Sequence, residues 1–160
     1  MDTIKMTYQL DETDKKILQL LQANARISNL ELAQAVNLSP TPCARRVKQL
    51  EQAGVITGYT TQINAQALGY ALTVYIAISM DRHTAERFAN LEKQVLAFPE
   101  VVQCSIVTGR SEDYLLKAVV RDMAHYEDFL LHRLNRIDGV SQVHTSFELR
   151  AVLNRCVTAP

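Results

Sequence analysis

The sequence has no overall charge bias and no long apolar segment. Lys plus Arg and Asp plus Glu both total 17, so the formal net charge is zero. Neutrality excludes a general attraction to nucleic acids or membrane surfaces, and any polyanion binding must come from a local patch. The apolar runs are far shorter than the roughly 20 residues of a membrane-spanning helix, and residues 1–10 lack the apolar core of a secretory signal. We therefore expect a cytoplasmic protein.

Cysteine and histidine are too scarce and too dispersed for a disulfide framework or a zinc site. The residues concerned are Cys43, Cys104, Cys156, His83, His125, His132 and His144. The sequence also lacks a Ser/His/Asp constellation, a phosphate-binding glycine loop and carboxylates paired in a cleft. We therefore expect reduced cysteines, no metal, no cofactor and no enzymatic activity. At 160 residues and 48% hydrophobic content, the chain is long enough for one domain or two small ones.

The best-marked helix lies between Ser39 and Gly54. Ser39 is a suitable N-cap with Pro40 just inside the helix, and Gly54 provides the left-handed residue that ends many helices. An apolar stripe at helical spacing marks the buried side. It consists of Cys43, Val47 and Leu50. The opposite side is polar and basic, and it has no acidic residue before Glu51.

Two shorter helices precede this one. Asp11 with Asp14 forms a weak capping-box pattern for the first, and Ser28 with Glu31 forms a full capping box for the second. The second helix should bury Leu30, Leu32, Ala33 and Val36. Three short helices with a tight turn before the third match a helix-turn-helix, whose third helix enters the major groove of DNA.

The outer side of the third helix suits base recognition. Arg pairs bidentately with guanine, Gln pairs with adenine, and Thr contacts a phosphate or a thymine methyl group. The alternative is an ordinary solvated face in a helical bundle, but the capped ends, the short spacing and the local absence of acids favour DNA. The predicted DNA-binding residues are Ser39, Thr41, Pro42, Arg45, Arg46, Lys48 and Gln49.

Residues 55–63 are rich in β-branched and aromatic side chains and predict a strand or wing. Residues 64–72, which include Gly69, predict a linker. The expected organisation is a winged helix-turn-helix domain with an N-terminal arm at 1–63, a linker at 64–72, and a second domain at 73–160.

The second domain contains an internal repeat. An offset of 39 residues aligns Tyr75 with Tyr114 and Arg82 with Arg121. Each copy has a strand, helix and strand pattern, with strands expected at 73–80, 101–108, 114–120 and 140–149. A repeated βαβ unit predicts the ferredoxin-like βαββαβ topology, and with the helical domain an α+β protein.

This topology places both helices on one face of the sheet and leaves the other face without a cover. The first strand is nevertheless apolar on both sides, with Ile76 pointing one way and Tyr75 and Ala77 the other. A second copy of the chain is the simplest cover, which predicts a two-fold dimer. A dimer also presents two recognition helices to successive major-groove sites.

A ligand site is expected at the turn between the two repeats. The simpler interpretation of residues 108–114 is a hairpin turn without a binding role. The backbone near Gly109, with Arg110, Ser111 and Asp113, also has the chemistry to hold a carboxylate and an ammonium group. Met123 and the segment Thr145-Ser146-Phe147 would add an apolar wall and hydroxyls if neighbouring subunits bring them near.

Several motifs together resemble the leucine-responsive regulator and AsnC family, the feast/famine regulators. They cover Leu10–Asp14 with Ile17-Leu18, Arg26–Ser28, Leu38–Cys43, Arg45–Val47 and Leu50–Ile56, and later Gly109 with Asp113–Lys117 and Asp122-Met123 with Tyr126. The resemblance implies a bacterial or archaeal transcription regulator that binds double-stranded DNA and a small amino acid, with a leucine-like or methionine-like effector favoured. It also implies cytoplasmic, nucleoid-associated homodimers that assemble into octamers.

The resemblance assigns Gly109, Asp113 and Tyr114 to the effector pocket, Met123 to the start of the following helix, and residues 145–148 to the opposite strand. One departure concerns the turn, because the family commonly has glycine, an acid, one residue and then aspartate. Here three residues separate Gly109 from Asp113. Two alternatives remain open: an amino-acid-binding adaptor without catalysis, and a metabolic enzyme with an accessory helical domain.

Overall fold

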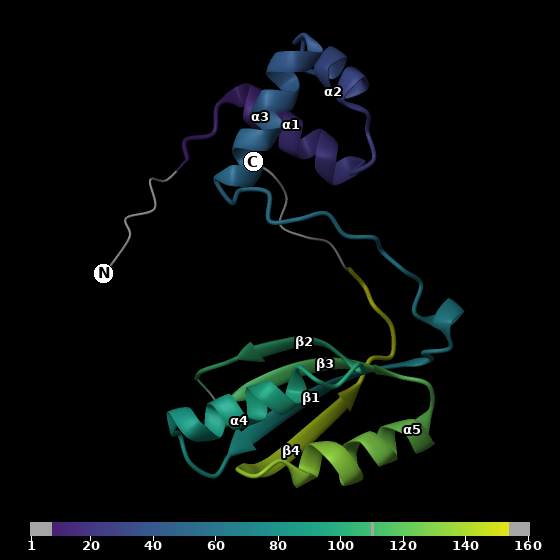
Figure 1. The fold of residues 1–160 in the computed structure, drawn as a ribbon. Helices are drawn as coiled ribbons and strands as arrows, with labels where there is room; N and C mark the ends of the chain where they lie inside the picture. Colours follow the sequence, from purple (N-terminus) through teal and green to yellow (C-terminus); the bar gives the residue numbers. More distant parts are fainter. Residues whose placement is uncertain (1–7, 110, 154–160) are drawn as a thin grey trace. The chain divides into compact units, whose positions relative to one another are not determined.

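The computed structural model describes residues 8–109 and 111–153. Expectations for Arg110 and Cys156 therefore lie outside the described residues. The chain divides into two compact units, with the boundary between Gln62 and Ile63 (Figure 1). Among the described residues, no helix has the length and apolar character needed to cross a membrane.

The N-terminal unit consists of three helices, α1 (Glu12–Ala23), α2 (Asn29–Ala35) and α3 (Pro40–Gln52). They surround a small core in which six side chains are buried. These are Ile17, Leu32, Ala33, Val36, Cys43 and Leu50. Val47 packs against this core and is half-buried. Leu30 departs from the expected apolar face, because 57% of its surface is exposed at the first turn of α2.

The capping predictions hold for α1 and α2 and fail in one detail for α3. Both expected capping boxes are complete, from Asp11 to Asp14 and from Ser28 to Glu31. Ser39 occupies the N-cap position of α3 but its side chain makes no capping hydrogen bond. The third residue of this helix is Pro42, which has no N–H for a capping side chain to bind. Gly54 adopts the expected left-handed conformation, with φ of 72°.

The predicted wing strand does not form. All of residues 55–63 are described, and none lies in a strand. A strand requires a pairing partner, and the described part of the N-terminal unit contains helices only. Val55 and Ile56 instead pack against the helical core. Farther along, the 3₁₀ turn η1 (Gln66–Leu68) precedes the first strand.

The C-terminal unit is a four-stranded antiparallel sheet with the order β2-β3-β1-β4. Its strands are β1 (Leu72–Met80), β2 (Val101–Ile106), β3 (Tyr114–Val120) and β4 (Val140–Phe147). Its helices are α4 (Ala85–Val95) and α5 (Met123–Asp128), which continues as a π-helical turn η2 (Phe129–Arg133) and a 3₁₀ turn η3 (Leu134–Arg136). This is the expected ferredoxin-like topology, and the α+β prediction is confirmed.

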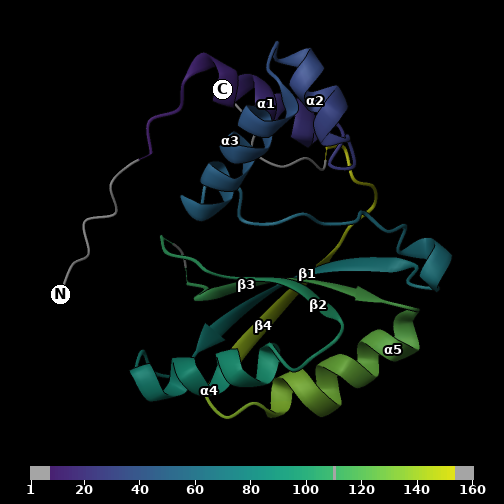
Figure 2. The ribbon, with the colours of Figure 1, turned by 45° about the horizontal axis from the view of Figure 1, so that its top comes forward.

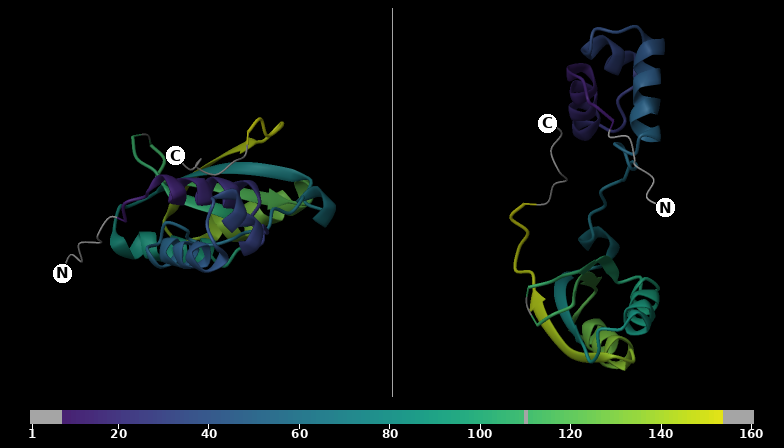
Figure 3. Two further views of the ribbon diagram at one scale, coloured as in Figure 1. Left: turned by 90° about the horizontal axis from the view of Figure 1, so that it is seen from above. Right: turned by 90° about the vertical axis from the view of Figure 1, so that its left-hand side faces the viewer.

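Both helices cover the same face of the sheet (Figure 2). The core beneath them is fully apolar at its centre. Its members with no exposed surface include Val74, Ile76, Ile78, Leu91, Val95, Leu116, Phe129 and Leu134. In the described part of this unit, no helix covers the opposite face (Figure 3). That open face carries half-buried Tyr75 and Ala77, together with Leu115, whose surface is 41% exposed.

A buried carboxylate anchors the α5 segment. Glu100, which is 5% exposed, accepts hydrogen bonds from both terminal nitrogens of Arg133, at 3.1 and 2.7 Å. The ring nitrogen Nε2 of His125 lies 2.9 Å from the same carboxylate. Burial raises the pKa of Glu100, but the hydrogen bonds from Arg133 and His125 outweigh it and hold this pKa below its usual value. The carboxylate is therefore ionised in the folded protein at neutral pH.

Candidate nucleic-acid interface and ligand site

The outer face of α3 presents most of the predicted DNA-binding residues to solvent. The exposed members are Ser39, Thr41, Arg45, Lys48 and Gln49, and Pro42 is half-buried. Within the described residues, neither Arg45 nor Lys48 forms an ion pair. No carboxylate of the described part of the domain therefore neutralises their charges. Because Ser39 makes no capping hydrogen bond, its hydroxyl is also available to a phosphate at the start of the helix.

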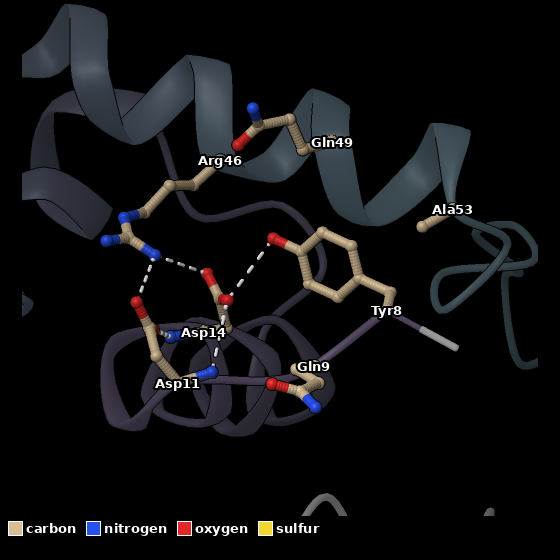
Figure 4. A pocket seen from close by; sticks show the side chains of 7 residues that line it. All are labelled: Tyr8, Gln9, Asp11, Asp14, Arg46, Gln49 and Ala53. Carbon is tan, nitrogen blue, oxygen red and sulfur yellow. Dashed lines mark hydrogen bonds and ion pairs between the residues drawn. The ribbon is translucent and has the colours of Figure 1, made fainter. Parts of the chain in front are cut away.

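Arg46 differs from the sequence-based expectation, because its guanidinium turns toward α1. Its Nη1 atom donates to Asp11 at 2.7 Å and to Asp14 at 2.8 Å (Figure 4). The side chain of Asp14 is only 2% exposed. The hydrogen bonds to Asp14 and Asp11 raise the pKa of Arg46 further. Arg46 therefore belongs to the contact between α1 and α3, at the margin of the exposed basic face.

An open cavity of about 620 Å³ lies beside this ion pair. It is lined by Tyr8, Gln9, Asp11, Asp14, Arg46, Gln49 and Ala53 (Figure 4). The hydroxyl of Tyr8 donates to Asp14 at 3.2 Å, so the end of the arm packs against the domain. Two carboxylates and one guanidinium give the cavity a net negative lining, which makes it unsuitable for a phosphate.

The turn predicted to bind an effector is held against β1. The N–H of Asp113 donates to the carbonyl of Ile78 at 2.8 Å. Its side chain accepts from the N–H of Met80 at 2.7 Å and lies 2.8 Å from Nε2 of His83. Gly109 and Ser111 are exposed on the turn, and Gly109 has φ of 97°. Asp113 is therefore a structural anchor of the turn, with both carboxylate oxygens already engaged.

Tyr114 is a core residue rather than an exposed ligand of the pocket. It has no exposed surface, and its hydroxyl donates to Glu92 at 2.8 Å. Its ring packs edge-on against Phe88 with 5.7 Å between centroids. Burial raises the pKa of Tyr114, and the hydrogen bond to Glu92 raises it further. Both the ring and the hydroxyl are engaged inside the domain, so the predicted effector contact of Tyr114 would have to be made by its backbone.

The other predicted effector residues lie at α5 and β4. Tyr126 of α5 donates to Thr145 at 2.7 Å, and its ring packs edge-on against Phe147 with 5.1 Å between centroids. Met123, at the start of α5, is 56% exposed, and Phe147 is 41% exposed. Thr145 and Phe147 are on the helix-covered face, whereas strand alternation places Ser146 on the open face, paired with Tyr75. Ser146 is therefore separated from the other two.

The structure does not bring the two groups of effector residues together within one chain. The turn with Gly109 and Asp113 precedes β3, whereas Met123 follows its other end. Seven residues of β3 span roughly 20 Å at about 3.4 Å per residue. A single amino acid is too short to contact both ends.

Sequence reasoning missed two side chains that matter at these places. Asp14 forms the buried ion pair with Arg46, and His83 contacts the anchor Asp113. The capping-box spacing predicted only that Asp14 caps the start of α1. The packing of α1 against α3 shows that Asp14 also pairs with Arg46. Within the described residues, no cluster of His, Cys, Asp and Glu has the arrangement of a metal site.

Comparison with known proteins identifies both units. Residues 10–57 match the winged helix-turn-helix DNA-binding model, and residues 73–157 match the Lrp/AsnC ligand binding domain. The Bkd operon transcriptional regulator of Pseudomonas aeruginosa is 37% identical over 147 residues, which cover 92% of this chain and 95% of that protein. The leucine-responsive regulatory protein of Escherichia coli is 41% identical over 136 residues, covering 85% and 82%.

Solved structures agree with this assignment. A transcriptional regulator from Neisseria meningitidis, NMB0573 in complex with L-Met, superposes with a TM-score of 0.88 and 38% identity, covering 95% of this chain and 97% of that one. Escherichia coli AsnC superposes with a TM-score of 0.86 and 26% identity, covering 94% and 99%. The matched models and relatives indicate a regulator rather than an enzyme. The chain belongs to the Lrp/AsnC family of transcription regulators.

Proposed function

We propose that this regulator recognises specific sites on duplex DNA through the outer face of α3. The supporting observation is that Arg45 and Lys48 are exposed, and no described carboxylate neutralises them. Thr41 and Gln49 lie on the same face and add hydrogen-bonding groups suited to base edges and phosphates. Ser39 and Pro42 mark the end of the helix that would enter the groove first.

The test of this face is Arg45→Ala in a gel-shift titration against DNA selected by the wild-type protein. Removing one base contact should weaken binding by roughly 1–3 kcal/mol. Lys16→Ala is the matched control, because Lys16 is an exposed cation on α1 rather than on α3. Unchanged binding by the Arg45 variant would show that α3 does not read DNA through this face.

We further propose that an amino acid with a leucine-like or methionine-like side chain is the effector. Met123 and Phe147 provide exposed apolar surface, which suits such a side chain. Tyr126 packs against Phe147 and donates to the hydroxyl of Thr145, which adds a polar group to this region. The exposed backbone at Gly109 and Ser111 suits the polar end of the ligand. The similarity to a regulator solved with L-Met supports the choice of ligand class.

The separation along β3 implies that two chains form the effector site. One copy would supply the turn at Gly109 and its neighbour would supply Met123. The open sheet face with Tyr75, Ala77 and Leu115 is the proposed dimer surface, and further assembly of dimers, to an octamer as in the family, would complete the pocket. The proposed place of action is the bacterial nucleoid in the cytoplasm.

Calorimetry with a panel of amino acids tests the effector proposal. Met123→Ala should weaken binding of L-methionine. Leu131→Ala should not, because Leu131 is an exposed apolar residue of η2 outside the proposed effector site.

Leu115→Asp should dissociate the dimer in sedimentation experiments. Amino-acid binding without DNA binding would instead favour an adaptor, and turnover of the amino acid would favour an enzyme.

A further inference from the structure

A partly buried ion pair joins α3 to α1, beside the proposed DNA-reading face, since Arg46 lines the same cavity as Gln49. Arg46 donates from a single nitrogen to Asp11 and Asp14, at 2.7 and 2.8 Å. The second oxygen of Asp14 accepts from the Tyr8 hydroxyl at 3.2 Å and from the Asp11 N–H at 3.3 Å. The side chain of Asp14 is 2% exposed, that of Arg46 is 29% exposed and that of Asp11 is 52% exposed. The contact between Arg46 and Asp14 is therefore partly shielded from water, whereas the contact with Asp11 lies at the surface.

A charged contact between α1 and α3 restricts the rotation of one helix against the other more than an apolar contact would. Apolar side chains such as Leu50 and Ile17 stabilise the domain but tolerate small rotations of one helix against another, because the hydrophobic effect has no direction. Hydrogen bonds between a guanidinium and carboxylates require defined distances and angles. Replacing a buried ion pair by apolar residues is often neutral for stability, so its value can lie in specifying one arrangement.

The rotation of α3 matters because of where Arg46 lies in the helix. It follows Arg45 directly and precedes Gln49 by three residues. The ion pairs of Arg46 with α1 therefore set the direction in which Arg45 and Gln49 point. Side chains extend to about 5–6 Å from a helix axis, so a rotation of about 10° moves them by about 1 Å. That displacement exceeds the roughly 0.5 Å range of hydrogen-bond lengths.

We propose that the network of Asp11, Asp14 and Arg46 fixes the rotation of α3 and thereby determines how sharply the protein distinguishes its DNA sites. Arg46 is on this account a positioning residue that acts through Arg45 and Gln49, and it makes no phosphate contact. The inference rests on the proposed DNA-binding function of α3. It extends that function by assigning specificity to residues that lie beside the reading face.

Two variants test the proposal. The double variant Asp14→Leu with Arg46→Met replaces both charged partners by apolar side chains and should preserve the fold. Asp14→Asn keeps the shape of the side chain and weakens the ion pair at a residue too buried to touch DNA. The probes are a duplex selected by the wild-type protein from a random library and a random duplex of equal length.

Both variants should lose specificity without losing general affinity. The ratio of specific to non-specific binding should fall about tenfold or more in the double variant, as expected when one base contact is misplaced. It should fall by a smaller factor in Asp14→Asn. Binding to the random duplex, and the slope of log affinity against log salt, should remain those of the wild type, because no phosphate contact is removed.

Other outcomes separate this inference from the function on which it rests. If the wild type selects no sequence, or Arg45→Ala has no effect on the selected duplex, the DNA-reading assignment of α3 fails. If Arg45→Ala weakens binding while both network variants keep the wild-type ratio, the positioning role is refuted. A salt slope reduced by about one in the double variant would show that Arg46 contacts a phosphate, which also overturns the proposal.

Discussion

Tyr114→Phe separates a structural role of the Tyr114 side chain from an effector-binding role. The substitution keeps the buried ring and its contact with Phe88, and removes only the hydroxyl that donates to Glu92 at 2.8 Å. A hydrogen bond to a charged group contributes about 1.5–3 kcal/mol. Glu92 is half-buried and regains water in the variant, so we expect the free energy of unfolding to fall by about 1–2 kcal/mol.

The assay is urea unfolding followed by circular dichroism, combined with calorimetry using L-methionine. The affinity for L-methionine should remain that of the wild type, because Tyr114 has no exposed surface. Tyr59→Phe is the control: its hydroxyl donates to Glu51 at 2.9 Å, but its surface is 53% exposed, so the change should be below about 0.5 kcal/mol. A Tyr114→Phe protein of unchanged stability that no longer binds methionine would refute the structural assignment.

Three further substitutions test the fold. Because the pKa of Glu100 is lowered in the folded protein, the ionised carboxylate stabilises the fold above about pH 4.3, and this stabilisation disappears as the pH falls through the folded pKa. The urea midpoints of wild type and Glu100→Gln should therefore differ at pH 7 and converge at pH 3. A difference between the midpoints that does not change with pH would contradict this. Gly139→Ala should lower the thermal midpoint by the equivalent of about 1–3 kcal/mol, since φ is +101° and the new Cβ would lie 2.9 Å from Cδ of Arg87; an unchanged midpoint would contradict it. Ser28→Ala removes the side-chain cap of α2 and should lower the free energy of unfolding by about 1 kcal/mol, which equal urea midpoints would disprove.

The features predicted correctly from the sequence are those specified locally. Capping boxes depend on residues three apart, and both were found as predicted. The 39-residue repeat depends on strand and helix periodicity, and the sheet of the C-terminal unit follows it closely. Tyr75 and Tyr114 are equivalent in the repeat but lie on opposite faces, because Tyr75 pairs with Lys117 across the strands. A repeat therefore predicts topology better than it predicts side-chain environment.

The errors arose where a partner from elsewhere in the fold decides the outcome. Arg46 lies at the margin of a basic helix face, and only the packing of α1 reveals the two carboxylates that bind it. The β-rich composition of residues 55–63 does not produce a strand without a neighbour. For Tyr114 a local signal was present, because it alternates in phase with Leu116 and Ala118 on the buried side of β3.

The length of β3 has a consequence for how the regulator responds to its effector. If the Gly109 turn of one chain and Met123 of another bind the same molecule, ligand binding and subunit association are thermodynamically linked. Dilution of the protein would then weaken its apparent affinity for the amino acid, with no change in any contact. The ligand in turn would favour the assembled state by the same free energy. The cellular concentration of the regulator would thus set the amino-acid level at which it responds.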